Sequence, residues 1–271
     1  MTRPHLHLVS DSTGETLDAI AKAGLAQFED GEVARHFWPM VRTAGHLDRV
    51  LMAIATQPGL VLHTLADGKL RDKLEQRCGD AGMTAVSVLD PVVGCLSHLL
   101  GRPVTGRVGR QHVMDAAYFA RVDAIQFSIA HDDGVLAENW EEADILLAGV
   151  SRTSKTPTAM YLGNRGYKVA NLPLVPTSPP PPELFALSNP LVVGLTTSPE
   201  RLIQIRRNRL LTMGQAGDTD YVDNELVMAE LAHARRLFAD RGWPVIDVTR
   251  RSIEETAAAV IKLLNERRGE E

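Results

Sequence analysis

The segment ILLAGVSRTSKTPTAMYLG, residues 145–163, decides how the second half of this chain folds. An apolar run typical of a buried parallel strand, DILLAGV at 144–150, leads through a short turn into a helical pattern. A strand, a tight turn and a helix N-terminus gather unpaired backbone N–H groups around one point, which favours a bound anion. The sequence therefore predicts an α/β unit with an anion-binding loop after this strand.

The turn nearly matches the phosphate-binding pattern G-x-x-x-x-G-K-[ST], with Ser154 in place of the second glycine. If that position needs a positive φ, a serine there costs roughly 1–2 kcal/mol, which a site with many donors tolerates. We predict that Lys155 reaches the outer phosphates of a nucleotide and that Thr156 offers its hydroxyl to Mg²⁺. The alternative is an ordinary strand–helix turn with an exposed lysine. The predicted nucleotide-binding residues are Gly149, Val150, Ser151, Arg152, Thr153, Ser154, Lys155 and Thr156.

A second polar group, AHDDG at 130–134, ends a predicted helix just before a glycine. Phosphoryl transfer to a hydroxyl benefits from a carboxylate that accepts or orients the proton, and carboxylates hold magnesium. A glycine-capped acidic turn is the alternative. Two carboxylates at a helix C-terminus oppose the helix dipole, however, so local structure does not explain them. We predict that His131, Asp132 and Asp133 act in catalysis together with Lys155.

A third polar group, VSDSTGET at 9–16, follows the first predicted strand and opens a helix. Open α/β sheets bind ligands at such positions. Serine, threonine and aspartate are equally good helix caps, so both interpretations stay open. The candidate residues for a second phosphate site or a contact with a target protein are Ser10, Asp11, Ser12, Thr13 and Gly14.

The rest of the chain alternates apolar runs with helical periodicity, which indicates two α/β domains with mostly parallel sheets, the C-terminal one carrying the P-loop. We predict an N-terminal domain at 1–105, a linking helix region at 106–140 with a helix near 111–129, and a nucleotide-binding kinase domain at 141–271. The predicted helix at 15–29 should bury Leu17, Ile20, Ala21, Leu25 and Phe28. Further strands are predicted at 5–10, 34–39, 60–65, 85–89, 168–174, 190–198 and 244–249, and further helices near 46–56, 67–79, 222–241 and after Ser198 and Ser252.

Composition excludes several classes of protein. The net charge of −5 over 271 residues argues against bulk binding to nucleic acid. No apolar run approaches the ~18 residues that span a bilayer, and no signal-peptide core is present, so neither a membrane nor a secretory location is expected. Cys78 and Cys95 show no metal-ligand spacing and form no disulfide framework, which favours the reducing cytoplasm. His5 and His7 should share a strand face but have no third ligand at a recognisable spacing.

Two further groups of residues are weaker candidates for a functional role. PERLIQIRRNRLL at 199–211 predicts a basic helix with Arg201, Arg206, Arg207 and Arg209 on a solvated face. Steering of an acidic or phosphorylated partner is the second interpretation of these arginines. Asp247, at the end of a late strand, is either a magnesium or hydroxyl partner or a helix-start carboxylate.

The motifs VSDSTGET, AHDDG and GVSRTSKTPT, with the ending GWPVIDVTRRSIEETA, resemble the bacterial regulatory proteins of pyruvate, phosphate dikinase and of phosphoenolpyruvate synthetase. The similarity covers essentially the whole chain. It implies a bifunctional enzyme that uses ADP to phosphorylate an active-site threonine of the dikinase and so inactivates it. It also implies a reverse activity, in which inorganic phosphate removes that group and pyrophosphate is released. The family's nucleotide site corresponds here to residues 149–156.

The resemblance also bears on the target. The dikinase-regulating branch resembles the RTSKT at 152–156, whereas the synthetase-regulating branch tends toward a glycine before the lysine. The dikinase is therefore the expected protein substrate, with the synthetase as the alternative. Two other functions stay open: a P-loop kinase for a small metabolite, and a non-catalytic nucleotide sensor. Whether the chain forms a homodimer is left open as well.

Overall fold

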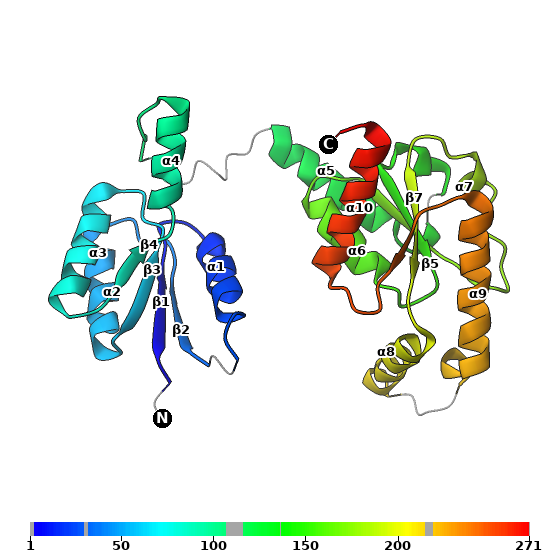
Figure 1. The fold of residues 1–271 in the computed structure, drawn as a ribbon, viewed down its shortest axis with the longest axis horizontal. Coiled ribbons are helices and arrows are strands. Elements are labelled where there is room, and N and C mark those ends of the chain that lie inside the picture. The colour runs from blue at the N-terminus through cyan, green and yellow to red at the C-terminus, as the bar shows by residue number, and fades with distance from the viewer. Residues whose placement is uncertain (1–2, 30–31, 107–115, 136, 215–218, 271) are drawn as a thin grey trace. The chain divides into compact units, whose positions relative to one another are not determined.

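In the computed structural model the chain divides into two α/β units, residues 1–113 and 114–271, and each contains one four-stranded sheet (Figure 1). The structure describes residues 3–29, 32–106, 116–135, 137–214 and 219–270. All strand pairs in both sheets are parallel, as the alternation of strands and helices predicted.

In the first unit the strand order is β2-β1-β3-β4. The turns after β1 and β3 therefore lie side by side at the carboxyl edge, where the strand order reverses and open α/β sheets bind ligands. Two apolar clusters, one around Val9, Leu47 and Val61 and one around Leu8 and Leu17, stabilise this unit. Its elements are β1 (His5–Val9), α1 (Glu15–Leu25), β2 (Ala34–Trp38), α2 (Ala44–Thr56), β3 (Gly59–His63), α3 (Gly68–Asp80), β4 (Ala85–Ser87) and α4 (Asp90–Leu100).

The second unit repeats this topology with the order β6-β5-β7-β8. Its strands are β5 (Ile145–Gly149), β6 (Val169–Pro173), β7 (Leu191–Thr196) and β8 (Val245–Asp247). Its α-helices are α5 (Ala116–Ala130), α6 (Lys155–Asn164), α7 (Glu183–Ala186), α8 (Pro199–Thr212), α9 (Asn224–Arg241) and α10 (Ile253–Arg268). The short 3₁₀ segments are η2 (Asp132–Gly134), η3 (Ala137–Glu142) and η4 (Asp220–Val222).

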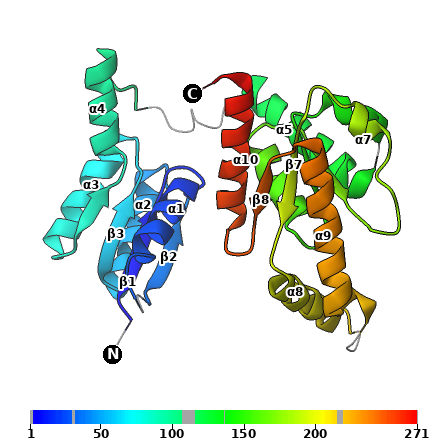
Figure 2. The same ribbon diagram turned by 45° about the vertical axis from the view of Figure 1, so that its right-hand side comes forward.

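Helices cover both faces of this second sheet (Figure 2). Leu146 faces a core with Leu202 of α8 and Phe238 of α9, whereas its neighbour Leu147 faces a core with Leu162 of α6 and Val260 of α10. Successive side chains of a strand point to opposite faces, so a strand buried on both faces must be continuously apolar. This is why 145–150 is an unbroken apolar run. The turn that follows β5 lies at the carboxyl edge of the sheet.

Helix starts follow the predicted caps. The Ser198 hydroxyl accepts a hydrogen bond from the backbone N–H of Arg201 at 3.2 Å. Ser252 and Glu255 form the reciprocal capping box expected from their spacing. Within the described ranges, no helix combines the length and the apolar character that crossing a membrane requires.

The predicted helix at 15–29 is too long, because α1 ends at Leu25. After Leu25 the backbone tightens, since the N–H of Gln27 donates to the Gly24 carbonyl and the N–H of Phe28 to the Leu25 carbonyl, both at 3.1 Å. Phe28 is therefore outside the helix and is 69% exposed instead of buried. Ile20 is exposed as well.

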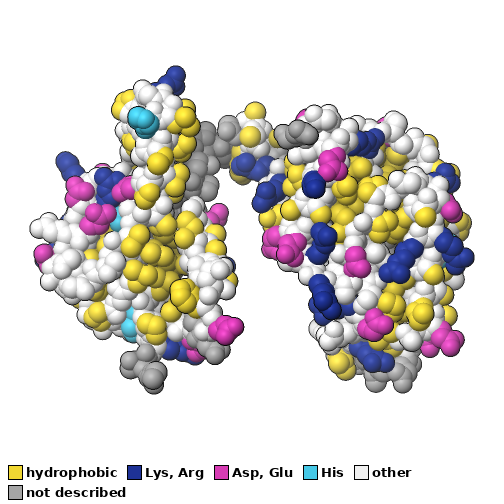
Figure 3. All heavy atoms as spheres, in the orientation of Figure 1, with side chains coloured by type: hydrophobic (Ala, Val, Ile, Leu, Met, Phe, Trp, Pro, Cys, Tyr) yellow, Lys and Arg dark blue, Asp and Glu magenta, His cyan; other side chains and the backbone are white. Residues whose placement is uncertain are grey.

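Helix α4 was not predicted; it contains a glycine, and its small polar face consists of Asp90, Ser97 and His98. None of its residues is buried, and Val92, Leu96, Leu99 and Leu100 are exposed, as the hydrophobic side chains over this helix in Figure 3 show. The predicted helix at 111–129 corresponds to α5, and its residues 111–115 lie outside the described residues.

Candidate functional site

The loop between β5 and α6 has an unusual backbone. A Cβ on Gly149 would lie 2.6 Å from the carbonyl oxygen of Leu195 on β7, so the close approach of the two strands requires glycine here. Arg152 has a φ of 76° and Ser154 a φ of 61°, both in the left-handed region. The position of the second glycine in the phosphate-binding pattern therefore does need a positive φ, and the serine there costs roughly 1–2 kcal/mol. Two strained residues within three positions hold a specific loop shape.

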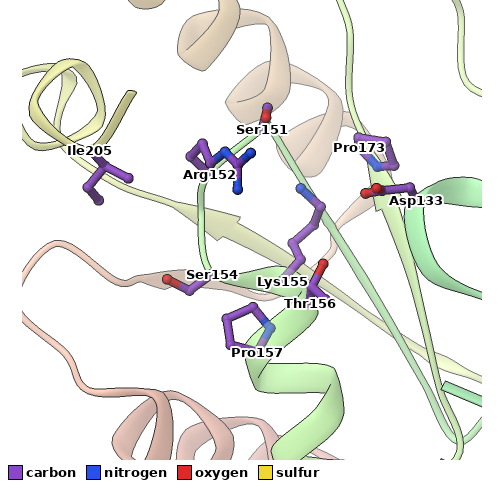
Figure 4. A pocket seen from close by; sticks show the side chains of 9 residues that line it. All are labelled: Asp133, Ser151, Arg152, Ser154, Lys155, Thr156, Pro157, Pro173 and Ile205. Atoms are coloured by element: carbon purple, nitrogen blue, oxygen red, sulfur yellow. The ribbon is translucent and has the colours of Figure 1, made fainter. Parts of the chain in front are cut away.

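A cavity of about 310 Å³ lies in front of this loop (Figure 4). One wall is formed by the loop and the first turn of α6, and others by the 131–134 segment, the end of β6 and helix α8. The lining residues are Asp133, Ser151, Arg152, Ser154, Lys155, Thr156, Pro157, Pro173 and Ile205. Five of the eight predicted nucleotide-binding residues line it.

Lys155 is buried, with only 5% of its surface exposed, and so the alternative of an exposed turn lysine is wrong. Its Nζ donates to the carbonyl oxygens of Gly149 at 3.0 Å and Val150 at 2.9 Å. Burial lowers the pKa of this lysine to about 8, and the nearby carboxylates of Asp133 and Asp132 oppose part of that shift. A cation is thus held inside the loop with two carboxylates close by.

Thr156 connects the loop to the second predicted motif. Its Oγ1 donates to the Asp132 carboxylate, 3.0 Å from Oδ1 and 3.3 Å from Oδ2. The neighbouring Asp133 has a φ of 52°, and its carboxylate points into the cavity across from the Lys155 amine (Figure 4). The Asp133 carboxylate makes no hydrogen bond to any residue that the structure describes. The structure therefore brings Lys155, Thr156, Asp132 and Asp133 together, as predicted from two separate motifs.

Asn171 on β6 organises the carboxylate segment and was missed. Its Nδ2 donates to Asp132 Oδ1, its Oδ1 accepts the Asp133 backbone N–H at 3.1 Å, and its own N–H donates to the His131 carbonyl at 3.1 Å. The side chain is 1% exposed. A buried amide with all of these partners fixes three consecutive residues. The available signal was a single amide inside the otherwise apolar run KVANLPL.

His131 lies beside the cavity but does not line it. Its ring stacks on Phe127 with centroids 3.8 Å apart, and its Nδ1 lies 2.8 Å from the Phe127 carbonyl oxygen. The side chain is 5% exposed, and its Nε2 has no hydrogen-bond partner among the described residues. The histidine packs on α5, whereas the two aspartates that follow it turn toward the loop.

A buried arginine supports the loop from the other side. Arg206 on α8 is 1% exposed and pairs with Glu230 of α9 at 2.7 Å, so its predicted place on a solvated face is wrong. The i, i+4 spacing with Leu202 and Leu210, both buried, explains this orientation. Its guanidinium lies 4.4 Å from the Tyr221 ring centroid, and the Tyr221 hydroxyl lies 3.3 Å from Ser151 Oγ. The exposed residues of the predicted set are Arg201, Arg207 and Arg209.

The third predicted motif lies in the first unit, at the carboxyl end of β1. Ser10 Oγ accepts from the Ser12 N–H and from the Thr64 hydroxyl at 3.0 Å. The buried Asp11 carboxylate accepts the Ala66 N–H at 2.7 Å. These side chains join the turn after β1 to the turn after β3. Thr13 is exposed, and Gly14 has a φ of 81° and packs against Phe37.

The other candidate residues, two histidines and an aspartate, contact neighbouring residues of the fold. His5 and His7 share a strand face as predicted, and their rings lie 5.1 and 4.6 Å from the ring of His36. Asp247 accepts the backbone N–H of Thr249 at 2.8 Å. In the part of the chain that the structure describes, no group of three or more His, Cys, Asp or Glu residues is arranged to hold a metal ion.

Comparison with known proteins gives consistent relatives along almost the entire chain. The protein from Rhizorhabdus wittichii is 66% identical over 271 residues, covering 100% of this chain and 99% of the relative. That from Novosphingobium aromaticivorans is 68% identical over 267 residues, covering 98% and 95%, and that from Sphingopyxis alaskensis is 64% identical over 267 residues, covering 98% and 99%. Each is named "Putative pyruvate, phosphate dikinase regulatory protein".

Among solved structures, a LacI transcriptional regulator from Lactobacillus brevis aligns with 90% of this chain and 98% of its own. Its 11% identity and TM-score of 0.21 are too low to bear on fold or function. The family model described as kinase/pyrophosphorylase matches residues 6–261. A family model that matches most of the chain and relatives at this identity show that the chain belongs to the kinase/pyrophosphorylase family of phosphotransferases.

Proposed function

We propose that this chain is a bifunctional enzyme that acts on pyruvate, phosphate dikinase. In one direction it transfers a phosphoryl group from ADP to an active-site threonine of the dikinase and inactivates it. In the other direction it removes that group with inorganic phosphate and releases pyrophosphate. The names of the relatives support the dikinase as target, and the family description supports both chemistries.

One observation carries the proposal: the buried Lys155 and Asp133 line one polar cavity at the N-terminus of α6, and Asp132 accepts a hydrogen bond from Thr156 in its wall. Phosphoryl transfer needs charge neutralisation and alignment more than covalent help from the protein. The loop amides and the lysine neutralise phosphate charge. One carboxylate accepts the proton of the threonine hydroxyl, and the other would bind the magnesium ion.

In the kinase direction the threonine oxygen attacks the β-phosphorus of ADP, and the bond to the α-phosphate oxygen breaks to release AMP. We assign the hydroxyl proton to Asp133, because its carboxylate lines the cavity and is not engaged by another described residue. Asp132 is held by Thr156 and Asn171 instead. Lys155 and the N–H groups at the start of α6 bind the phosphate oxygens.

Residues for a magnesium ion fit this arrangement. The Thr156 hydroxyl and the Asp132 carboxylate are hard oxygen ligands already within 3.0 Å of each other. Magnesium is usually held by one or two carboxylates, water and substrate phosphates, so a richer cluster is not required. When bound there, the ion would neutralise charge on the phosphates of the nucleotide.

In the reverse direction inorganic phosphate attacks the phosphothreonine phosphorus, pyrophosphate forms, and the threonine oxygen regains a proton. Phosphate already carries negative oxygens and needs no strong base. The proton that hydrogen phosphate loses as it attacks passes through Asp133 to the leaving threonine oxygen, so the step needs no other proton source. The same loop would hold the attacking phosphate, because it binds the anion without recognising the rest of the nucleotide.

The test is to incubate the purified protein with the phosphohistidine form of the dikinase, magnesium and ADP labelled at the β-phosphate. Labelled phosphothreonine should appear, and later addition of phosphate should release labelled pyrophosphate. Parallel reactions with phosphoenolpyruvate synthetase and with ATP plus small metabolites distinguish the alternative substrates. Nucleotide binding without turnover of any substrate would favour a sensor and contradict the proposal.

A further inference from the structure

Two exposed arginines flank the cavity on helix α8. Ile205 of this helix lines the cavity. Residues four apart on a helix are neighbours on one face, so Arg201 and Arg209 lie one turn before and one turn after Ile205 on the same stripe. We call Arg201, Ile205 and Arg209 the α8 stripe. It forms a basic rim next to the proposed reaction site.

The charges of this stripe are not neutralised by an ion pair in the part of the chain that the structure describes. Arg201 and Arg209 are exposed, and neither forms an ion pair with any residue that the structure describes. Among the described residues, the Arg201 guanidinium donates only to the neutral side-chain amide of Gln204, at 3.0 Å. In contrast, the charge of Arg206 on the same helix is neutralised by Glu230.

Local helix energetics also fail to explain Arg201. Arg209 in the last turn complements the helix dipole, but Arg201 is in the first turn, where a cation is unfavourable. Ser198 is the N-cap, so a glutamate at position 201 would complete a capping box. An arginine thus stands where the opposite charge would stabilise the helix, which points to a role outside the fold.

Arg152 extends the basic rim into the cavity itself. It is exposed, lines the cavity, and keeps a left-handed backbone, with its Nε 3.4 Å from the Tyr221 hydroxyl. The chain as a whole has a net charge of −5, whereas residues 199–212 contain four arginines and one glutamate. Such a local reversal of charge attracts a negatively charged surface.

We propose that the α8 stripe docks an acidic segment of the protein substrate, so that the segment's carboxylates lie over Arg201 and Arg209 while the target hydroxyl enters the cavity. This inference rests on the proposed function, because it presupposes a protein substrate. Exposed complementary charges at the rim of an interface act mainly on the association rate and on its salt dependence. The stripe would then determine which protein is recognised, without taking part in nucleotide binding.

Helix α8 supplies its own control. Arg207 is exposed like Arg201 and Arg209 but lies two residues from Ile205, about 200° around the helix. Arg207→Glu changes the net charge of the protein by the same amount on the opposite face. The double variant Arg201→Glu/Arg209→Glu can be matched with Arg207→Glu/Arg236→Glu, since Arg236 is another exposed arginine outside the stripe.

The experiment measures binding of each variant to immobilised pyruvate, phosphate dikinase between 50 and 300 mM salt, together with the Kd for ADP. The Arg201→Glu/Arg209→Glu variant should lose affinity for the dikinase by about tenfold or more at low salt and lose most of its salt dependence. The matched double variant should bind within about twofold of the wild type, and all Kd values for ADP should agree. Circular dichroism and melting temperature show that the variants are folded.

Equal loss of dikinase binding in the stripe variant and the matched variant would overturn the inference, as would no loss in either. A stripe-dependent affinity for an oligonucleotide but not for the dikinase would assign the stripe to nucleic acid and also overturn it. Phosphothreonine formation is scored separately. If dikinase binding depends on the stripe but no phosphothreonine forms, the stripe is the docking surface and the proposed reaction is refuted. If phosphothreonine forms but binding does not depend on the stripe, the proposed reaction is supported and the docking inference is refuted.

Discussion

The Thr156 hydroxyl lies 3.0 Å from Oδ1 of Asp132, a residue 24 positions earlier in the chain. This contact joins the start of α6 to the segment after α5. It unites two motifs that are each ambiguous alone, a glycine-poor phosphate loop and an acidic turn. Each motif is a common structural element by itself, and their juxtaposition gives the arrangement a chemical meaning.

Replacement of Thr156 tests this contact. Thr156→Val keeps the shape of the side chain and removes the hydroxyl, so we expect magnesium affinity in the presence of ADP to fall about 10- to 100-fold. Thr156→Ser keeps the hydroxyl and should stay close to the wild type. Isothermal titration with magnesium at fixed ADP measures the difference. Equal magnesium affinity of the valine and serine variants would remove Thr156 from the proposed metal site.

Removal of the Asn171 amide should damage the carboxylate segment and the stability of the second unit. Asn171→Ala leaves the Asp133 N–H without its partner and the Asp132 carboxylate with Thr156 alone. We expect a loss of about 1–3 kcal/mol in the free energy of unfolding. Asn164→Ala, at the exposed end of α6, is the control and should change stability by less than about 0.5 kcal/mol. Urea denaturation measures both values.

Much of this architecture could be predicted from periodicity, because parallel strands buried on both faces give unbroken apolar runs. The runs around Leu146 and Val193 are examples. The end of α1 could not be predicted, because the apolar spacing continues to Phe28 although the backbone tightens after Leu25. Asn171 and Arg206 depend on tertiary neighbours. A buried amide or guanidinium is specified by the groups that satisfy it, and these lie 24 to 39 positions away.

The Arg206–Glu230 pair should behave as a buried ion pair. Removing one partner leaves the other uncompensated, so Arg206→Met should lower the free energy of unfolding by about 3 kcal/mol. The double variant Arg206→Met/Glu230→Leu should recover a large part of that loss. A double-mutant cycle by chemical denaturation provides the coupling energy. A coupling energy near zero would mean that the pair does not hold α8 and α9 together.

Ser154 offers a test of backbone strain. With a φ of 61°, Ser154→Gly removes the steric cost of roughly 1–2 kcal/mol but adds freedom to the unfolded chain that costs about 0.5–1 kcal/mol. We expect a net gain of between zero and about 1.5 kcal/mol in stability. Ser154→Ala keeps the strain and should show no gain. Thermal unfolding of both variants compares them, and a stabilised alanine variant would indicate that the serine hydroxyl, not its backbone, is costly.

The lowered pKa of Lys155 predicts how nucleotide binding depends on pH. The pKa is about 8 without a ligand, because burial outweighs the nearby carboxylates, and a bound phosphate should raise it. The affinity for ADP should therefore weaken as the pH rises through 8, by about tenfold between pH 7 and pH 9. Isothermal titration at several pH values measures this change. Lys155→Met binds more weakly, and any pH dependence it retains belongs to ADP and to other groups.

The lowered pKa of Lys155 affects stability in the opposite direction: ADP affinity falls as the pH rises, whereas the free energy of unfolding increases. Between about 8 and the ordinary lysine value of 10.5, the unfolded chain holds a proton on Lys155 that the folded chain has lost. The unfolded state then binds more protons, so the contribution of this residue to the free energy of unfolding rises with pH across that window. Wild type minus Lys155→Met should show the rise in urea denaturation. A flat difference, together with ADP affinity that does not weaken above pH 8, would mean that the lysine stays charged in its buried position.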